Sequence, residues 1–394
     1  MSVEQLDALL APDGQALLER LSREAPAATR SLRLGGALRT QFPADLVAAA
    51  LSQQELRRAA AAKFRRAEQM YFTRPGLEQA SAEVISRHRA LRFAGCARLA
   101  DLCTGIGGDL VALAGRAERA ETLAVDLDEV HLRMALLNAE VYGVASRVRT
   151  VQADVRTVDV AGLDGVFVDP ARRLGGRRLR TGRSEPPLPW CLGLAEVVPA
   201  VGIKLAPGLD RNAVPAGWEL EFLADRRELK EAVAWSPRLA TAVRRATVLP
   251  GGHTLTPGAG SPVPVGPPGE FLLDPNPAVT RAGVVEDLAR LTGCWKIDDQ
   301  IAFLSTDHPA RTPFARTLRV LESAPWQEKL LPARLRALDI GSVDIRRRGL
   351  AGDVEALHRR LKLAGSRRAT LVMTRMLDKP WSLVCVDDDA NKTE

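Results

Sequence analysis

The sequence predicts an α/β protein with a central open, parallel β-sheet, a helical N-terminal region and a small basic α/β domain at the C-terminus. Three observations support this fold class. Apolar, strand-like stretches alternate with helical patterns between residues 96 and 208. A glycine-rich turn follows the first of these strands, and a shorter alternation of helices and strands returns after residue 326. Alternation of this kind implies right-handed β-α-β crossovers and therefore parallel strands.

The N-terminal region, residues 1–93, is predicted to be helical. Ala, Leu, Arg and Glu dominate it, and residues 54–69 are strong helix formers. A break follows at Thr73-Arg74-Pro75-Gly76, where proline is suited to start a new helix. Residues 76–93 carry an apolar stripe at helical spacing, so we expect a second helix there.

The central domain, residues 94–248, contains the alternating elements. The expected strands are 97–103, 122–128, 148–155, 165–170 and 201–208, with helices at 109–117 and 129–143. Residues 218–225 and 230–236 form a final candidate pair of strands, and an antiparallel pair is a permitted ending for a parallel sheet.

Residues 249–325 are predicted to be a Pro/Gly-rich linker followed by a connecting segment. Residues 250–269 contain six Pro and six Gly but no Asp, Glu, Lys or Arg. A helix at 276–292 and a strand-like stretch at 296–304 follow. The small α/β domain, residues 326–387, shows helices at 327–338 and 353–363 and strands at 343–347, 369–376 and 381–387. Residues 388–394 form an acidic tail that we expect to be disordered.

The charge is concentrated in that last domain. The 394 residues contain 55 Lys and Arg against 48 Asp and Glu, and residues 326–386 alone contain 13 against 6. Forty-seven of the 55 basic residues are Arg, a side chain suited to phosphate and nucleic acid, although codon bias toward Ala, Arg and Gly explains the excess equally well. A basic segment favours a polyanionic partner.

Several classes of protein are disfavoured. No apolar run reaches the roughly 18–20 residues of a membrane span, and the first residues do not resemble a signal peptide. The five cysteines form no C-x-x-C, and the five histidines show no ligand spacing, so neither a disulfide framework nor a metal site is expected. These features favour a cytoplasmic protein.

The stretch most informative about chemistry is LADLCTGIGGDLVALA, residues 99–114. A strand ends, the chain turns through Gly105, Gly107 and Gly108, and a helix begins. Glycine permits a close backbone approach to a ligand, and a helix N-terminus presents unpaired N–H groups. Such a turn at the carboxyl end of the first parallel strand is typical of a nucleotide pocket. A dehydrogenase is disfavoured because Leu110 stands where its fingerprint needs Gly or Ala.

Four acids also stand at the carboxyl ends of predicted strands. Asp101, Asp126, Asp154 and Asp169 stand near the carboxyl ends of the first four predicted strands. An open parallel sheet gathers its ligand at that edge, and a carboxylate after the second strand can accept two ribose hydroxyls. A single acid of this kind is often just a helix cap, but four in register favour a binding site.

These residues resemble the class I S-adenosylmethionine-dependent methyltransferases, which have a Rossmann-like fold. The family's first motif is an acid, three residues and then Gly-x-Gly, which Asp101 to Gly107 fit with Cys103 and Thr104 where Gly and Cys are frequent. The resemblance implies that S-adenosyl-L-methionine is the cofactor. It also implies that Asp126 holds the ribose and Asp154 reads the adenine amino group. The cofactor-binding residues expected in full are Asp101, Cys103, Thr104, Gly105, Gly107, Asp126, Leu127, Asp154 and Asp169.

The whole chain resembles the bacterial methyltransferases with a THUMP-like C-terminal domain. The supporting segments include KFRRAEQMYFTRPGLEQAS (63–81), DLCTGIGGD (101–109), VDPARR (168–173) and VDIRRRG (343–349). True THUMP domains accompany RNA-modifying enzymes, so the resemblance implies an RNA substrate, tRNA or rRNA.

The catalytic candidates are Asp169, Pro170 and Lys204. In the family, the loop after strand four borders the methyl group and the acceptor, so Asp169 can orient or deprotonate an acceptor N–H. Asp169-Pro170-Ala171-Arg172 lacks the second proline and the aromatic residue of the amine-methylating motif, which disfavours that chemistry. Lys204 lies in an apolar run, where a lysine needs a partner, and Asp169 is a candidate for that partner.

The candidate nucleic-acid contacts are arginines in two places. They lie in the loop after Pro170 and in the C-terminal domain, and comprise Arg172, Arg173, Arg346, Arg347, Arg348, Arg367 and Arg368. If they share a face they form a phosphate-binding footprint, and otherwise they are a solvated charged surface. Tyr71 and Phe72 are either stacking residues for a base or part of the core.

Two other functions stay open at this point. A non-catalytic RNA-binding or assembly factor with a vestigial cofactor pocket is consistent with the altered motif at Asp169. A methyltransferase of small molecules or proteins is consistent with the central domain alone.

Overall fold

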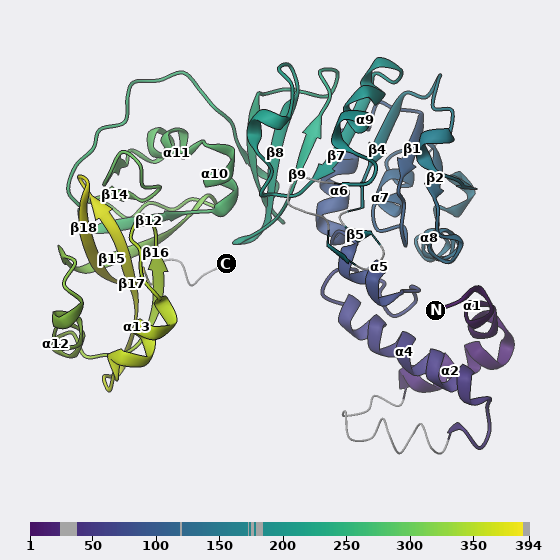
Figure 1. The fold of residues 1–394 in the computed structure, drawn as a ribbon, viewed down its shortest axis with the longest axis horizontal. Coiled ribbons are helices and arrows are strands. Elements are labelled where there is room, and N and C mark those ends of the chain that lie inside the picture. The colour runs from purple at the N-terminus through teal and green to yellow at the C-terminus, as the bar shows by residue number, and fades with distance from the viewer. Residues whose placement is uncertain (24–37, 119, 172, 175–176, 179–183, 389–394) are drawn as a thin grey trace. The chain divides into compact units, whose positions relative to one another are not determined.

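The computed structural model describes residues 1–388 apart from 24–37, 119, 172, 175–176 and 179–183 (Figure 1). The chain divides into two compact units, and the boundary between them passes through one β-hairpin. Unit 1 comprises Met1–Glu219 and Glu231–Thr241, and unit 2 comprises Leu220–Lys230 and Ala242–Glu394. The predicted tail, 388–394, lies outside the described residues apart from Asp388. None of the helices within the described residues has the length and apolar character of a membrane span.

The N-terminal part of unit 1 is helical, as predicted. Its helices are α1 (Val3–Leu10), α2 (Pro12–Arg23), α4 (Ala44–Ala60), α5 (Arg74–Gln79) and α6 (Glu83–Leu91). The first three pack together with Phe64, Met70 and Phe72 around a core that also includes Ile106 and Met134 of the central domain. This core therefore fixes the helical region onto the glycine-rich turn.

Two helix predictions in this region were wrong in extent. The helix expected at 54–69 ends at Ala60, and the one expected at 76–93 is split into α5 and α6. The Lys63 ammonium accounts for the end of α5, because it donates to the carbonyls of Leu77 (2.7 Å), Glu78 (3.3 Å) and Ala80 (2.9 Å). Tertiary contacts of this kind override helix propensity.

The sheet of unit 1 confirms the α/β fold class. Its strands are β1 (Arg98–Leu102), β2 (Glu121–Asp126), β3 (Val148–Gln152), β4 (Gly165–Val168) and β7 (Ala200–Leu205). They lie in the order β3-β2-β1-β4-β7 and all pair in parallel. The antiparallel strand β9 (Glu228–Trp235) pairs with β7. The strand order reverses between β1 and β4, which is where ligands bind in such sheets.

Short helices connect these strands. They are α7 (Leu110–Ala114), α8 (Glu129–Val141) and α9 (Leu188–Gly193), with single 3-10 turns at 145–147, 155–157, 194–196 and 211–213. The side chains of Leu110, Leu132 and Ala135 pack with Ala124, so α7 and α8 cover β2. Helix α7 has five residues and is shorter than the predicted 109–117.

Unit 2 contains more strands than the sequence predicts. One group comprises β8 (Glu219–Asp225), β10 (Arg244–Leu249) and β11 (His253–Leu255), in which β10 pairs in parallel with β8 and antiparallel with β11. The other is a seven-stranded sheet in the order β13-β14-β12-β15-β18-β17-β16. Its strands are β12 (Phe271–Pro275), β13 (Trp295–Lys296), β14 (Leu304–Thr306), β15 (Ala315–Pro325), β16 (Ile340–Arg347), β17 (Arg367–Met376) and β18 (Lys379–Asp387).

The segment predicted as a linker, 249–325, therefore supplies part of this sheet. Strand β15 pairs along its length with β18, so the C-terminal domain is not confined to 326–387. The helix expected at 276–292 is divided into α10 (Pro277–Ala282) and α11 (Val285–Thr292) by Gly283, which has a φ of 69°. The strand expected at 296–304 is reduced to β13 and the start of β14.

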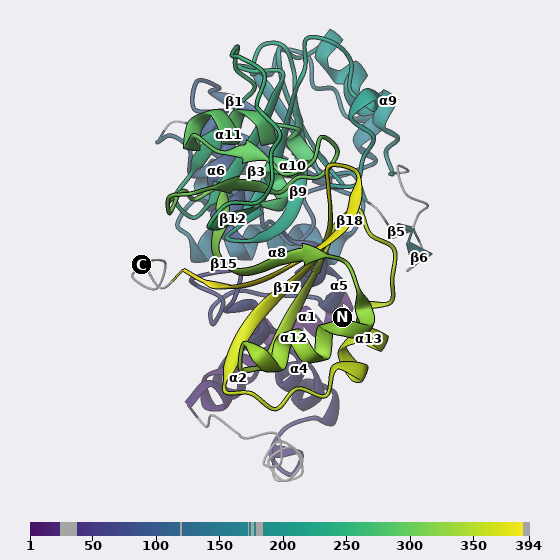
Figure 2. The same ribbon diagram turned by 90° about the vertical axis from the view of Figure 1, so that its left-hand side faces the viewer.

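The two faces of the seven-stranded sheet are covered differently. Helices α12 (Leu331–Ala337) and α13 (Val354–Leu361) cover one face, where Leu335 and Leu357 pack against Leu371 (Figure 2). On the opposite face, Ile297, Ile301 and Phe303 pack against Leu272, Leu318, Val372, Leu383 and Cys385. We call this second side the Phe303 face.

Candidate functional site

A cavity of about 740 Å³ opens at the carboxyl ends of the parallel strands in unit 1. Its volume lies within the range of small-molecule sites. Asp126, Asp154 and Asp169 line it, as do Glu78 and Gln79 of α5. The structure thus brings together three of the four predicted strand-end acids and adds a wall from the N-terminal helices.

The glycine-rich turn forms the floor of this cavity with a left-handed backbone. Cys103, Gly105 and Gly107 all adopt left-handed conformations, with φ of 60°, 56° and 84°. A Cβ on Gly105 would meet no atom within 4 Å, whereas one on Gly107 would lie 2.9 Å from the Cα of Ala135. Gly105 therefore leaves the backbone open to a ligand, and Gly107 permits the turn to pack on α8.

Asp126 is held rigidly at the end of β2. Its Oδ2 accepts a hydrogen bond from the Gly105 N–H (2.7 Å), and its Oδ1 accepts one from the Asp128 N–H (2.9 Å). Thr104 fixes the same turn, because its N–H donates to the Val125 carbonyl (3.1 Å). Cys103, Thr104 and Leu127 line the cavity beside Asp126, in agreement with their expected positions.

Asp101 lies beneath the cavity floor. It is buried, and its Oδ2 has no hydrogen-bond partner among the described residues. Burial, followed by the charges of Asp109 and Asp169, raises the pKa of Asp101 well above its ordinary value. Burial thus favours the neutral form of this carboxyl group, and a positive charge nearby would favour its ionised form.

Asp154 makes an ion pair that the sequence did not reveal. The guanidinium of Arg156 binds it through Nη2 (2.6 Å) and reaches Glu185 through Nη1 (2.8 Å). The hydrogen bonds from Arg156 lower the pKa of Asp154. Arg156, two residues after Asp154, thus connects the third strand end to the far side of the cavity.

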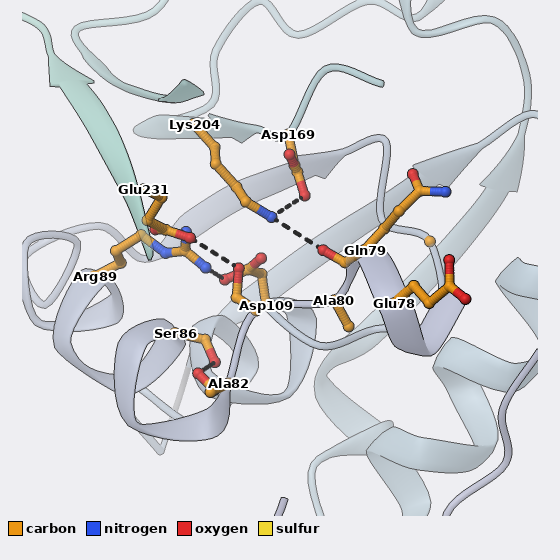
Figure 3. A network of polar contacts seen from close by, with 12 residues as sticks. Glu78, Gln79, Ala80, Ala82, Ser86, Arg89, Asp109, Asp169, Lys204 and Glu231 are labelled. Atoms are coloured by element: carbon orange, nitrogen blue, oxygen red, sulfur yellow. Dashed lines mark hydrogen bonds and ion pairs between the residues drawn. The ribbon is translucent and has the colours of Figure 1, made fainter. Parts of the chain in front are cut away.

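Lys204 pairs with Asp169, as the sequence favoured. Its buried ammonium lies 2.6 Å from Asp169 Oδ2 and 3.4 Å from the carbonyl of Gln79 (Figure 3). Strand β7 therefore positions the carboxylate that follows β4, and it also holds the end of α5. Pro170 lines the cavity directly after Asp169.

A second buried cation was missed by sequence reasoning. Arg89 of α6 is 1% exposed and pairs with Asp109, which follows the glycine-rich turn, and with Glu231 of β9 (Figure 3). Its guanidinium also lies over the ring of Phe167, 4.9 Å from the centroid. An arginine among helix-forming residues carries no local sign that it will be buried, so its burial could not be predicted from the sequence.

Side-chain amides hold the segment that leads into α5. Gln53 bonds to both backbone groups of Phe72, and Asn138 does the same for Tyr71, at 2.8–3.0 Å. Asn138 also donates to the carbonyl of Ile106 (2.8 Å). Tyr71 and Phe72 are buried in the N-terminal core, so their possible role as stacking residues is not supported.

The arginine-rich loop after Pro170 begins and ends on one backbone pair. Ala171 and Glu185 exchange two hydrogen bonds, at 2.8 and 2.9 Å, and both line the cavity. Arg172 lies outside the described residues, and Arg173 belongs to the two-residue strand β5 (Arg173–Leu174), which pairs with β6 (Arg177–Arg178). Both ends of the loop therefore lie at the rim of the cavity.

The C-terminal arginines lie at two separate places on the sheet of unit 2. In the parallel pair β16 and β17, Arg367 is opposite Ile340 whereas Arg346 is opposite Val372. Five residues of strand separate the two positions, or roughly 16 Å at about 3.3 Å per residue. The structure thus places Arg367 and the adjacent Arg368 at one end of these strands and Arg346 at the other.

Two of the predicted arginines make contacts inside unit 2. Arg347 donates to the carbonyl of Gly352. Arg348 pairs with the buried Asp274 (2.9 Å), donates to the carbonyl of Ala302 (2.8 Å) and lies over the ring of Phe303. Burial lowers the pKa of Arg348. Its role in holding the fold was not anticipated from the sequence.

The charges around the cavity in unit 1 favour a cationic ligand. Six Asp and Glu side chains line the cavity against two Lys and Arg side chains, namely Glu78, Asp109, Asp126, Asp154, Asp169 and Glu185 against Arg156 and Lys204. Asp101 and Glu231 are left out of this comparison because burial raises the pKa of both. No group of three or more metal-ligating side chains occurs in the described part of the chain. A ligand with a positive charge and a ribose fits both this excess and Asp126.

Comparison with known families agrees with this geometry. Residues 96–181 match the family described as RNA cap guanine-N2 methyltransferase, and residues 315–386 match the THUMP domain-like family. Residues 2–60 match a family described as a domain of unknown function. The second match begins at the first residue of β15, which supports the inclusion of this strand in the C-terminal domain.

Individual relatives cover most of the chain. An uncharacterized S-adenosylmethionine-dependent methyltransferase of Mycobacterium tuberculosis is 37% identical over 329 residues, which span 78% of this chain and 85% of that protein. A crystal structure from Porphyromonas gingivalis W83, provisionally described as a methyltransferase, has a TM-score of 0.76 at 21% identity and covers 95% of this chain and 98% of its own. The second likeness concerns the fold, and the first establishes the family. The chain belongs to the S-adenosylmethionine-dependent methyltransferases, and its C-terminal domain is THUMP-like.

Proposed function

We propose that this methyltransferase acts on RNA. The observation that carries the proposal is the presence, on one chain, of the acid-lined cavity and a THUMP-like domain with 13 basic against 6 acidic residues at 326–386. The match of residues 96–181 to a family described by an RNA substrate adds support. A concentrated positive charge attracts a polyanion and steers its association.

The cavity residues fit S-adenosylmethionine. We assign the ribose hydroxyls to Asp126 and the adenine amino group to Asp154. When the adenine binds, Arg156 then either shares the Asp154 carboxylate with it or releases that carboxylate. The acids that line the cavity stabilise positive charge on the ligand, because they outnumber the Lys and Arg side chains that line it. When bound, the cofactor supplies a methyl group on a positively charged sulfur.

We assign the acceptor side of the cavity to Asp169 and Pro170. Lys204 holds one oxygen of the Asp169 carboxylate at 2.6 Å, so the side chain has a fixed direction. Asp169 can then accept a hydrogen bond from the N–H or O–H of the acceptor and take the proton that methylation releases. Lys204 is a positioning residue in this scheme, since its ammonium faces Asp169 and Gln79. Alignment of the reacting atoms supplies much of the rate in such displacements.

The experiment is a methyl-transfer assay with the full chain and a cofactor that carries a labelled methyl group. Total RNA, total protein and a small-molecule extract are offered as acceptors in parallel. We expect label that becomes soluble on ribonuclease treatment, and none with the Asp126→Ala variant. Label found only in the protease-sensitive or small-molecule fraction would show that RNA is the wrong acceptor.

A further inference from the structure

Four arginines of unit 2 gather around one buried carboxylate. Asp274, at the end of β12, is 4% exposed and pairs with Arg227 (3.2 Å) and Arg348 (2.9 Å). Arg316 is the partner of Asp274 in the register of β12 and β15, and it pairs with Asp387 at 2.6 Å. Arg346 completes the group, which we call the Asp274 cluster: Arg227, Arg316, Arg346 and Arg348.

Strand register shows that these side chains share one side of the sheet. Asp274 alternates with Leu272, and Arg316 alternates with Leu318, both of which belong to the Phe303 face. Arg346 is opposite Val372, another residue of that face. Directly opposed residues of neighbouring strands project to the same side, so Arg346 lies on the Phe303 face as well.

The other two arginines of the Asp274 cluster, Arg227 and Arg348, lie outside strands β12, β15 and β16. Arg348 lies over the ring of Phe303, 4.8 Å from its centroid, and Arg227 comes from the turn between β8 and β9. Three segments far apart in sequence thus contribute cations to one place.

The Asp274 cluster has an excess of positive charge. Four guanidiniums face two carboxylates, those of Asp274 and Asp387. Arg346 is exposed and has no side-chain hydrogen bond or ion pair with any described residue. Burial, together with the charges of Arg316, Arg346 and Arg348, lowers the pKa of Arg227. Asp274 fixes two of the arginines, so the entropy cost of ordering them is met in the folded protein.

We propose that the Asp274 cluster binds a phosphate group of the RNA backbone. The proposal rests on the proposed function, and it adds Arg227 and Arg316 to the arginines that the sequence indicated. Guanidiniums held in a fixed fork bind phosphate oxygens in pairs, and such contacts position a nucleic acid without reading its sequence. The other predicted arginines, Arg367 and Arg368, lie at the opposite end of β16 and β17 and are not part of this site.

The test compares two double variants of the full chain. Arg316→Gln with Arg346→Gln removes one paired and one unpaired arginine of the cluster. Arg359→Gln with Arg360→Gln is the matched control on α13, over the opposite face: Arg360 pairs with Glu328 (2.8 Å), and Arg359 has no side-chain partner among the described residues. Binding of labelled total tRNA is measured over a series of KCl concentrations, and calorimetry with S-adenosylhomocysteine checks the pocket of each variant.

We expect the cluster variant to bind tRNA on the order of tenfold more weakly at low salt. The slope of log affinity against log salt should fall by about 0.7 to 0.9, the value for one lost phosphate contact. The control should stay near the wild type. Equal losses in both variants, or no loss in the cluster variant, would overturn the proposal while RNA remains the substrate. If the wild type neither binds nor methylates RNA, the proposed function fails first and this inference with it.

Discussion

The cavity of unit 1 and the Asp274 cluster of unit 2 carry opposite excesses of charge. The cavity is lined by more carboxylates than cations, and the cluster collects arginines around one carboxylate. Asp126, Asp154 and Asp169 stand at the carboxyl ends of strands of one parallel sheet, so a single rule of topology places them together. Arg316 and Arg346 reach the Asp274 cluster through the register of a mixed sheet, and Arg227 comes from the turn between β8 and β9. A site built by local rules can be predicted from sequence, and one built by long-range pairing cannot.

The largest effect is expected from replacing the buried cation of unit 1, Arg89. Arg89→Met removes one partner from a network in which Arg89 is 1% and Glu231 3% exposed. Loss of one member of a buried ion pair costs about 3–5 kcal/mol, because the remaining charge is left without compensation. We expect the urea midpoint of unfolding to fall accordingly.

The control for that experiment lies on the same helix. Arg87 pairs with Glu83 at 3.2 Å but is 56% exposed, so Arg87→Met should change the free energy of unfolding by less than about 1 kcal/mol. Equal midpoints for the Arg89 and Arg87 variants would show that the buried network does not support unit 1.

Asp126→Ala tests whether the strand-end acids serve the cofactor. A carboxylate that accepts two hydroxyls contributes about 1.5–3 kcal/mol per charged hydrogen bond, so affinity for S-adenosylhomocysteine should fall by at least about 100-fold. Calorimetry measures this directly. Binding of tRNA should be unaffected, since Asp126 belongs to the cavity and not to the Asp274 cluster. Unchanged cofactor affinity would contradict the assignment.

Asp274→Asn is the counterpart in unit 2 and should have a smaller effect on stability than Arg89→Met. Its two arginine partners are 40% and 27% exposed, so water can solvate them once the carboxylate is gone. We expect a loss of about 1–3 kcal/mol, measured by thermal unfolding. A loss as large as that of the Arg89 variant would remove the distinction between the two regions.

Asp101→Asn should reveal the cost of the buried carboxylate through its pH dependence. The pKa of Asp101 is raised in the folded protein, so the unfolded state ionises at a lower pH than the folded state. The free energy of unfolding therefore falls as the pH rises from the unfolded pKa to the folded pKa. Asparagine cannot ionise. The variant should therefore match the wild type at low pH and exceed its stability at higher pH, by on the order of 1 kcal/mol. Thermal unfolding between pH 4 and 8 measures the difference, and a constant difference would contradict it.

The predictions from sequence succeeded where pattern and topology are local. The parallel strands, the glycine-rich turn and the positions of Asp126, Asp154 and Asp169 follow from alternation of elements along the chain. The partners of these residues do not. Arg156 binds Asp154 and Glu185, and Arg89 joins α6 to β9, through contacts that no spacing reveals.

The same limit explains the missed strand β15. It lies in the segment predicted to connect the linker to the basic domain, and it pairs with β18, in which Trp381 is the partner of Pro325. Pairing over that distance leaves no periodic signal near either strand. The basic domain therefore extends further back along the chain than its charge indicated.

The backbone pair between Ala171 and Glu185 has a consequence for how this enzyme can diversify. Both ends of the intervening loop are anchored on the cavity rim, so its length and composition can change while the strands beneath stay in place. A chimera that carries the intervening segment of a relative, assayed for methyl transfer, would test whether this segment bears on the choice of acceptor.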